Sequence, residues 1–390
     1  MNRIPFIDCI DIVGTSVHEF EGSKLYISTG AVDTDKIDST QVEEVTYQNR
    51  PSRANLVVKE GDVLFAKMQA TNKTIYIDNI LSHYIFSTGF FAVRAKEGVI
   101  TPSCLYLLLS SDQFLSQKDK NCSGATQKAI TNNGLKKINI SIPNLSVQEG
   151  ISKILFKLQL SIVQHKTMLD KYDALIKSRF VEMFGDPILN NKKWIVDSLG
   201  AYMTVLTDFS ANGSYELLDN NVVMYDEPNY AIMVRTTDFE NGDFTSNLKY
   251  IDQTAYELLS KSKLFGGELI MNKIGSAGKI YIMPNLNYPA SLGRNAFMFR
   301  FNDQINTTFL YYLLTSDYGT KEIQQYVRGA VTKTITKDST RKIKIIVPPI
   351  ESQNQFADFV TQVEKQKATV QQSIDKLETL KKSLMQEYFG

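Results

Sequence analysis

A short element of small, hydroxyl and lysine residues occurs twice in the sequence. The pattern Gly-Ala-x-x-Lys-x-Ile-Thr covers residues 124–131 and returns at 329–336, so Lys128 and Lys333 hold the same place in each copy. Small residues let a ligand approach the main chain, and a lysine beside hydroxyl and amide groups suits a phosphate. Basic residues also outnumber acidic ones by five to one between 118 and 137, and by seven to two between 321 and 344. Both stretches favour contact with a phosphate backbone, and a solvated basic face is the simpler alternative.

A second pair of polar loops carries side chains that can read bases. Residues 67–73 are Lys-Met-Gln-Ala-Thr-Asn-Lys, and residues 272–279 are Asn-Lys-Ile-Gly-Ser-Ala-Gly-Lys. Lysine, glutamine and asparagine can pair with guanine and adenine edges in the major groove. Both loops follow similar strand-like segments, 61–67 and 267–273, yet their contents differ. We therefore expect matching scaffolds with different recognition surfaces.

The sequence contains no recognisable constellation for catalysis or metal binding. Its histidines, at positions 18, 83 and 165, form no HExxH motif, and no cysteine and histidine cluster has zinc spacing. Residues 275–280 differ from a phosphate loop, because Lys273 stands where the first glycine belongs and Ile280 replaces the Ser or Thr. Glu-Pro-Asn-Tyr at 227–230 lacks the second proline of an amino-methyltransferase element. We predict no metal site, no bound cofactor and no catalytic residue in this chain.

Composition sets broader limits. Because 43 Lys and Arg balance 42 Asp and Glu, for a net charge of +1, any case for a nucleic-acid partner rests on local charge. Acids gather between 216 and 257, where nine face only Arg235 and Lys249. Three cysteines are too few for a disulfide framework. The first residues lack the apolar core of a signal peptide, and no window approaches the roughly 18 apolar residues of a membrane span, which predicts a soluble cytoplasmic protein.

The whole chain is a tandem repeat. Residues 105–185 align with 310–390 at a constant offset of 205, with 24 identities in 81 positions. Upstream, the copies still match at 61–67 and 267–273 and diverge toward their starts. The second part of each copy is similar, which suggests one shared mechanical role. The first part, here called the front, diverges, which suggests two different recognition roles.

Each copy ends in a heptad pattern that predicts a long amphipathic helix. Apolar residues recur at alternating spacings of four and three, after Pro143 in the first copy and after Pro348 in the second. Two such helices can pair as an antiparallel coiled coil whose polar seam residues, His165 and Lys367, help to set the register. The alternative is two ordinary amphipathic helices of a helical domain. The predicted seam is Ile151, Leu155, Leu158, Ile162, Leu169, Tyr172, Ile176, Phe356, Val360, Val363, Val370, Ile374, Leu377 and Leu384.

The front of each copy predicts a mixed sheet. Segments 25–28, 74–77, 90–93 and 279–282 are short, β-branched or aromatic, and bounded by turn residues. A short helix follows in each copy, at 104–109 and at 309–314, and the first has Thr101 as its cap and Pro102 as its first residue. The predicted fold class is α+β. It has mixed α/β domains at 1–145 and 187–350, each followed by a long helix, at 146–186 and 351–390.

This ordered set of features resembles the specificity subunit of type I restriction-modification systems. The resemblance covers essentially the whole chain and includes a Pro-then-Gln entry into each long helix, Pro143 with Gln148 and Pro348 with Gln353. In the second copy, residues 267–278 are close to the family's strand-and-loop pattern, and Val-Arg-Thr-Thr-Asp at 234–238 is similar to another common stretch. The first copy departs from the loop pattern at 68–71, which contains neither glycine.

The resemblance implies a non-catalytic DNA reader. Each front would be a target-recognition domain for half of a bipartite site in double-stranded DNA, and the paired helices would set the gap between the halves. Two modification subunits, which bind S-adenosylmethionine and methylate adenine, would dock on the chain, and restriction subunits with an ATP- and Mg-dependent motor and nuclease could join them. A coiled-coil adaptor with two protein-binding α+β modules is the competing interpretation. The candidate DNA-binding residues are Lys67, Gln69, Thr71, Asn72, Lys73, Gln127, Lys128, Arg235, Thr236, Asn272, Lys273, Ser276, Lys279, Arg294, Arg328, Thr332 and Lys333.

Overall fold

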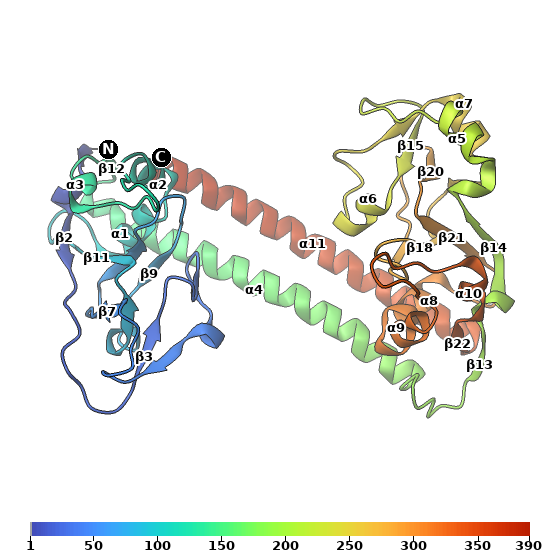
Figure 1. Cartoon of the computed structure of the whole chain (residues 1–390), viewed down its shortest axis with the longest axis horizontal. Coiled ribbons are helices and arrows are strands. Elements are labelled where there is room, and N and C mark those ends of the chain that lie inside the picture. Colours follow the sequence, from blue (N-terminus) through green and yellow to red (C-terminus); the bar gives the residue numbers. More distant parts are fainter. Residues whose placement is uncertain (1) are drawn as a thin grey trace. The chain divides into compact units, whose positions relative to one another are not determined.

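The computed structural model describes residues 2–390 and divides the chain into two units. Unit 1 contains the residues up to Met168 together with Val370–Gly390, and unit 2 contains Leu169–Thr369. Each unit combines small sheets, short helices and parts of two long helices (Figure 1). The predicted α+β fold class, with two tandem copies and long helices, is confirmed.

Unit 1 is built on two four-stranded sheets. The first is antiparallel, in the order β2-β11-β8-β9, and the second has the order β6-β3-β10-β7 with β3 and β10 parallel. Strand β1 pairs with β12, and β4 with β5. The strands are β1 (Asn2–Pro5), β2 (Ile10–Val13), β3 (Lys24–Ile27), β4 (Val32–Asp33), β5 (Lys36–Ile37), β6 (Glu43–Val45), β7 (Ala54–Leu56), β8 (Val63–Ala66), β9 (Thr74–Tyr76), β10 (Ile85–Ser87), β11 (Phe90–Ala95) and β12 (Asn139–Ile142).

Capping side chains start the short helices of unit 1. Helix α1 (Pro102–Leu109) begins as the sequence predicts, since the Thr101 hydroxyl accepts a hydrogen bond from the Cys104 amide and proline takes the first turn. Ser111 caps α2 (Asp112–Lys120) and Thr131 caps α3 (Asn132–Leu135) in the same way. These three helices lie between β11 and β12 in the sequence, and α1 forms one buried apolar cluster with side chains of the first sheet.

Unit 2 repeats this plan. Its antiparallel sheet has the order β14-β21-β18-β19, its mixed sheet the order β16-β15-β20-β17, and β13 pairs with β22. The strands are β13 (Ile195–Ser198), β14 (Met203–Asp208), β15 (Ala231–Val234), β16 (Tyr250–Ile251), β17 (Lys263–Leu264), β18 (Leu269–Asn272), β19 (Ile280–Ile282), β20 (Ala290–Leu292), β21 (Ala296–Phe301) and β22 (Lys344–Val347). The short helices are α5 (Tyr215–Asn221), α6 (Thr236–Asn241), α7 (Gln253–Leu258), α8 (Thr307–Thr315), α9 (Asp317–Gln324) and α10 (Lys337–Lys342).

The two long helices, α4 (Leu145–Phe184) and α11 (Ile350–Phe389), each have 40 residues and contribute to both units. In unit 1 the start of α4 lies beside the end of α11 (Figure 1), and Leu155 shares a buried cluster with Phe389. In unit 2 the end of α4 lies beside the start of α11, and the Phe180 and Phe356 rings are 5.4 Å apart. The helices therefore pair antiparallel within each unit, and each one ends in the core of the unit in which the other begins.

The predicted seam residues lie on the inner faces of these helices. Those that are buried are Ile151, Leu155, Ile162, Ile176, Phe356, Val360, Val363, Val370 and Ile374, and those that are half-buried are Leu158, Leu169, Tyr172, Leu377 and Leu384. The polar seam positions have partners, because Lys367 pairs with Asp173 at 2.7 Å and a His165 ring nitrogen lies 2.8 Å from the Ser161 carbonyl. No helix among residues 2–390 is both long and apolar enough to cross a membrane.

Candidate nucleic-acid interface

In unit 1 the structure joins the two polar loops that the sequence singles out. The first, here called the strand-end loop, is residues 67–73 and connects β8 to β9. The second, here called the basic hairpin, is residues 123–129, closed by two hydrogen bonds between the Ser123 and Ala129 main chains. The main-chain amide of Gln69 donates a hydrogen bond to the Lys128 carbonyl at 2.9 Å. The main-chain amide of Ile130 donates to the Lys67 carbonyl at 2.8 Å. The two loops therefore form one continuous surface.

Unit 2 forms the same surface from its own copy. Its strand-end loop is residues 273–279 and its basic hairpin residues 328–334. The Gly275 amide donates to the Lys333 carbonyl at 2.9 Å, and the Ile335 amide to the Lys273 carbonyl at 3.0 Å. Each hairpin turns through a glycine with positive φ, +136° at Gly124 and +104° at Gly329. A side chain at either glycine would overlap a main-chain carbonyl across the turn, so the turn requires the repeated glycine.

The lysines of these surfaces fall into two groups. Lys128, Lys333 and Lys279 are exposed, and within residues 2–390 none of their ammonium groups has an ion pair or hydrogen bond. An ammonium group with no internal partner is available to an external anion. The other predicted contacts that are exposed are Gln69, Asn72, Gln127, Ser276, Arg294, Arg328 and Thr332.

The second group of lysines is held inside the molecule. Lys67 donates to the Thr88 carbonyl at 2.8 Å and lies over the Phe91 ring, and its burial lowers the pKa of its ammonium group. Lys73 donates to the Thr29 carbonyl, also at 2.8 Å. Lys273 pairs with Asp208 at 2.8 Å. These three lysines are predicted DNA contacts, but they are half-buried and their ammonium groups bind groups of the protein itself.

Asn272 and Thr71 also face inward. Asn272 is 1% exposed, and its amide donates to Glu240 at 3.1 Å. The Thr71 hydroxyl donates to the Met68 carbonyl at 2.6 Å within its own loop. Neither side chain presents its polar group freely on the surface.

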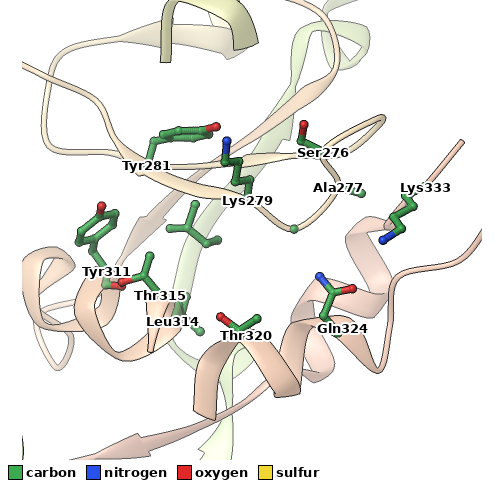
Figure 2. Close-up of a pocket in the computed structure, with 12 residues that line it drawn as sticks. Ser276, Ala277, Lys279, Tyr281, Tyr311, Leu314, Thr315, Thr320, Gln324 and Lys333 are labelled. Carbon is green, nitrogen blue, oxygen red and sulfur yellow. The ribbon is translucent and has the colours of Figure 1, made fainter. Parts of the chain in front are cut away.

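A cavity of about 560 Å³ with a mixed polar and apolar lining opens beside the strand-end loop of unit 2. Figure 2 shows Ser276, Ala277 and Lys279 along one wall, Thr320 and Gln324 of α9 on the other, and Lys333 at the side. Lys279, Lys333 and Gln324 are among its lining residues, and their positive charge and hydrogen-bonding groups suit a phosphate or a base edge.

The sequence of the chain matches a family model over the regions that carry these surfaces. The model describes the type I restriction modification DNA specificity domain, and it matches residues 12–171 and 208–379. The chain belongs to this family. Two specificity domains in tandem correspond to the two copies of the repeat.

Two relatives of this specificity-domain chain are named specificity subunits of type I restriction enzymes. The type I restriction enzyme HindI specificity subunit of Haemophilus influenzae is 26% identical over 195 residues, which are 48% of this chain and 41% of that protein. The MjaVIII specificity subunit of Methanocaldococcus jannaschii is 22% identical over 379 residues, which are 94% of this chain and 85% of that protein.

Solved structures share the fold of the specificity domains. The S subunit of a type I restriction-modification system from M. genitalium has a TM-score of 0.60 at 12% identity, covering 100% of this chain and 96% of that one. A chain from a type I R-M system, studied for its complex assembly and conformational transition, has a TM-score of 0.54 at 18% identity, covering 99% and 97%.

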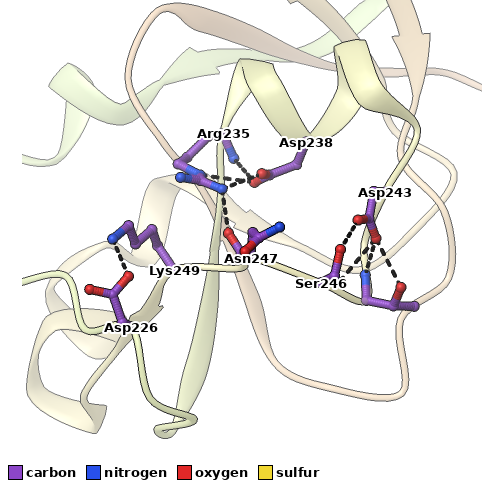
Figure 3. Close-up of polar contacts among 8 residues, drawn as sticks. Asp226, Arg235, Asp238, Asp243, Ser246, Asn247 and Lys249 are labelled. Carbon is purple, nitrogen blue, oxygen red and sulfur yellow. Dashed lines mark hydrogen bonds and ion pairs between the residues drawn. The ribbon is translucent and has the colours of Figure 1, made fainter. Parts of the chain in front are cut away.

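In the second specificity domain, the remaining predicted contacts do not line the cavity, and the two arginines among them form separate ion pairs. Figure 3 shows the Arg235 guanidinium facing Asp238, with an ion pair of 2.6 Å, and donating to the Asn247 carbonyl at 2.7 Å. Thr236 begins α6 next to it. Arg294 pairs with Asp219 and donates to the Tyr215 hydroxyl at 3.1 Å. Both arginines are partly neutralised by internal carboxylates.

Some of the acidic residues of this specificity domain have internal structural roles. Asp226 pairs with Lys249 (Figure 3). Asp243 accepts hydrogen bonds from the Ser246 hydroxyl and from the Thr245 and Ser246 amides, and these bonds hold the pKa of its carboxyl well below the usual range. The local excess of acid therefore reflects turn formation and ion pairing at these positions.

Sequence reasoning missed two residues that anchor the strand-end loops. Lys118, 1% exposed, anchors the strand-end loop of unit 1 through its ammonium group. Asp208, 6% exposed, accepts from Lys273 and from Lys337, both at 2.8 Å, and so ties the strand-end loop of unit 2 to the start of α10. The partners lie far apart in the sequence, and no local pattern connects them. Within residues 2–390, no three His, Cys, Asp or Glu residues are grouped to hold a metal ion.

Proposed function

We propose that this chain is the DNA-reading subunit of a type I restriction-modification enzyme. In each unit, one joined surface combines a strand-end loop, which differs between the copies, with a basic hairpin, which is shared. The shared hairpin would position the DNA backbone through Lys128 or Lys333, and the variable loop would read bases. The observation that carries the proposal is this pairing of a constant basic element with a variable polar one, twice in one chain.

Individual side chains suit these two roles. Gln69, Asn72 and Gln127 in unit 1, and Ser276 and Lys279 in unit 2, are exposed hydrogen-bonding groups of the kind that read base edges. Val331 is 98% exposed in the basic hairpin of unit 2, where it could contact the methyl group of a thymine. The two units would each read one half of a bipartite site, and the antiparallel helices α4 and α11 would fix the gap between the halves.

The chemistry would be carried out by partner subunits. In this proposal the chain has no catalytic residue and binds no cofactor, and S-adenosylmethionine, ATP and Mg belong to the modification and restriction subunits. Two modification subunits would dock, one for each copy, with restriction subunits joining them. The outer face of α4 supports a protein partner, because Ile154, Phe156 and Leu160 are 39–58% exposed in unit 1, and Leu175 and Val181 are 46% and 55% exposed in unit 2.

Comparing the genome-wide adenine methylation of the host with and without this gene tests the proposal. We expect one bipartite motif to lose its methylation when the gene is deleted. Exchanging residues 1–145 for the same region of a relative should then alter one half of the motif and leave the other half unchanged. A motif that persists without the gene would contradict the proposal, and a motif with both halves altered by the exchange would contradict modular reading.

A further inference from the structure

The strand-end loops of the two units have the same length but are anchored by different chemistry. Residues 68–73 align without a gap with residues 274–279, between β8 and β9 in one unit and between β18 and β19 in the other. Near its start, each loop donates the same main-chain hydrogen bond to its basic hairpin, from the main-chain amide of Gln69 in unit 1 and of Gly275 in unit 2. Beyond that point the two loops diverge.

In unit 1 the loop closes around the ammonium group of a buried lysine. Lys118 of α2 donates to the Met68 carbonyl at 3.0 Å and to the Thr71 carbonyl at 2.7 Å. Its neighbour Asp119 accepts from the Ala70 amide at 3.1 Å. Burial lowers the pKa of the Lys118 ammonium group, although the nearby Asp119 carboxylate partly offsets this effect. The carbonyl groups that Lys118 holds span the part of the loop that contains Gln69 and Ala70.

In unit 2 the same position of the repeat carries Ile323, which is buried in α9. Its side chain packs against the loop at Gly278, where an added Cβ would lie 2.5 Å from the Ile323 Cγ2 atom. Gly278 has φ of +87°, and its amide donates to the Asn272 carbonyl at 2.8 Å. This loop is therefore closed by glycine and an apolar contact, with Ile323 in the place of the Lys118 ammonium group.

We infer that Lys118 is a positioning residue that sets the base-reading shape of the strand-end loop in unit 1. Lys118 closes the loop of unit 1 as the glycines of 273–279 close the loop of unit 2, so residues 68–71 do not need glycine. Because its ammonium group points into the protein, Lys118 acts on recognition through the loop and makes no contact with DNA. The inference rests on the proposed function for its link to DNA, whereas the anchoring of the loop is tested independently of DNA.

The first test compares Lys118→Met with Lys120→Met in the full chain without DNA. Both changes remove one positive charge from α2, but Lys120 is exposed and lies outside the loop contacts. Hydrogen exchange at the amides of residues 68–73 should rise about tenfold in Lys118→Met and stay unchanged in Lys120→Met. Methionine puts no charge in the interior, and Asp119, which loses its ion pair with Lys118, is 32% exposed and can be hydrated, so the melting temperature should not fall by more than a few degrees. Unchanged exchange in Lys118→Met would overturn the anchoring.

The second test measures DNA discrimination by the assembled methyltransferase complex. The probes are a duplex with the methylated motif and two duplexes in which one or the other half is scrambled. Lys118→Met should lose about tenfold of its discrimination at the half read by unit 1 and none at the other half. The salt dependence of binding should stay as in the wild type, since no phosphate contact is lost. A wild type that discriminates at neither half would refute the proposed function, whereas a Lys118→Met variant that discriminates like the wild type would refute only this inference.

An exchange of anchors provides a rescue. Replacing residues 68–72 by Ile-Gly-Ser-Ala-Gly, the sequence of 274–278, should leave the loop poorly protected while Lys118 remains. Adding Lys118→Ile should restore slow hydrogen exchange, because the grafted loop then packs against an isoleucine, as the loop of unit 2 packs against Ile323 at Gly278. Equal exchange rates for the graft with and without Lys118→Ile would show that the residue at position 118 does not position the loop.

Discussion

Gln148 and Gln353, 205 residues apart, make the same three hydrogen bonds at the start of α4 and α11. Each is fully buried, and its side-chain oxygen accepts a hydrogen bond from the main-chain amide of the residue that caps an earlier short helix, Thr101 of α1 or Asn306 of α8. Its amide group donates to two carbonyls, those of Val99 and Pro143 in unit 1 and those of Gln304 and Pro348 in unit 2. The glutamine therefore locks each long helix to the front of its own unit.

Replacing Gln148 by methionine tests this lock. The variant keeps the length of the side chain but removes the partner of three main-chain groups, one buried and two partly buried, at about 1–3 kcal/mol for each group that water cannot reach. We expect a clear fall in the melting temperature of the full chain by calorimetry. Gln164→Met, at an exposed position of α4, is the matched control. Equal melting temperatures for the two variants would show that the glutamine contributes nothing to stability.

The exposed lysine of the basic hairpin should act on DNA through charge alone. Lys333→Gln is expected to weaken binding to any duplex and to lower the slope of log K against log salt by about 0.9, the effect of one phosphate contact. Titrations at several salt concentrations measure the slope. Lys376→Gln, an exposed lysine on α11, removes the same charge outside the surface and should leave the slope unchanged. A slope that is the same in Lys333→Gln and the wild type would remove Lys333 from the interface.

Asp208 should stabilise unit 2 in a way that depends on pH. Burial raises the pKa of this carboxyl, but hydrogen bonds from Lys273 and Lys337 outweigh that effect and hold the pKa below its usual value. A carboxyl with a lowered folded-state pKa stabilises the fold above its unfolded value, near 3.8, and loses that contribution as the pH falls through the folded value.

Asp208→Asn is therefore expected to cost about 1–3 kcal/mol of unfolding free energy at pH 7, because two partly buried ammonium groups lose their counter-ion. The difference from the wild type should shrink below pH 4. Denaturant unfolding at pH 7 and at pH 3 measures it. A difference that stays constant between these pH values would exclude the ion pairs as its source.

Shortening both long helices by one heptad tests their role as a spacer. Removing residues 163–169 and 371–377 keeps the seam pattern in each helix and shortens both helices by the same length. Seven helical residues span about 10 Å, so the gap between the half-sites should shorten by about three base pairs while the bases of each half stay the same. Methylation mapping reads the gap directly, and an unchanged gap would rule out the spacer role.

The sequence predicts the parts of this fold that depend on local pattern. The heptads place Ile151 through Ile176 and Phe356 through Leu384 on the inner faces of helices, because a period of 3.5 residues needs no knowledge of distant contacts. Capping at Thr101 and the strands at 74–76 and 280–282 are equally local. The self-alignment also locates both loops of each recognition surface.

What the sequence does not predict is which polar groups face outward. Asn272 ends strand β18, whose four residues are all buried, so no alternation of polar and apolar residues marks its inner side. The sequence predicts that Lys67 and Lys273 contact DNA, yet the ammonium groups of both lie over aromatic rings of the protein. Their orientation depends on Phe91 and Phe297, which belong to strands paired across the sheet and lie more than 20 residues away. Long-range pairing of this kind also conceals Lys118 and Asp208.

The ending of α11 in the core of unit 1 has a consequence for how the chain folds as it is synthesised. Phe389 is fully buried beside Leu155 and Phe114, yet the ribosome makes it more than 200 residues after them. Unit 2 is continuous in sequence and can fold before the end of α11 is made. Until then the apolar face at the start of α4 lacks the part of α11 that covers it in unit 1. A chain interrupted before residue 370 would keep that face open and present it to chaperones or to other nascent chains.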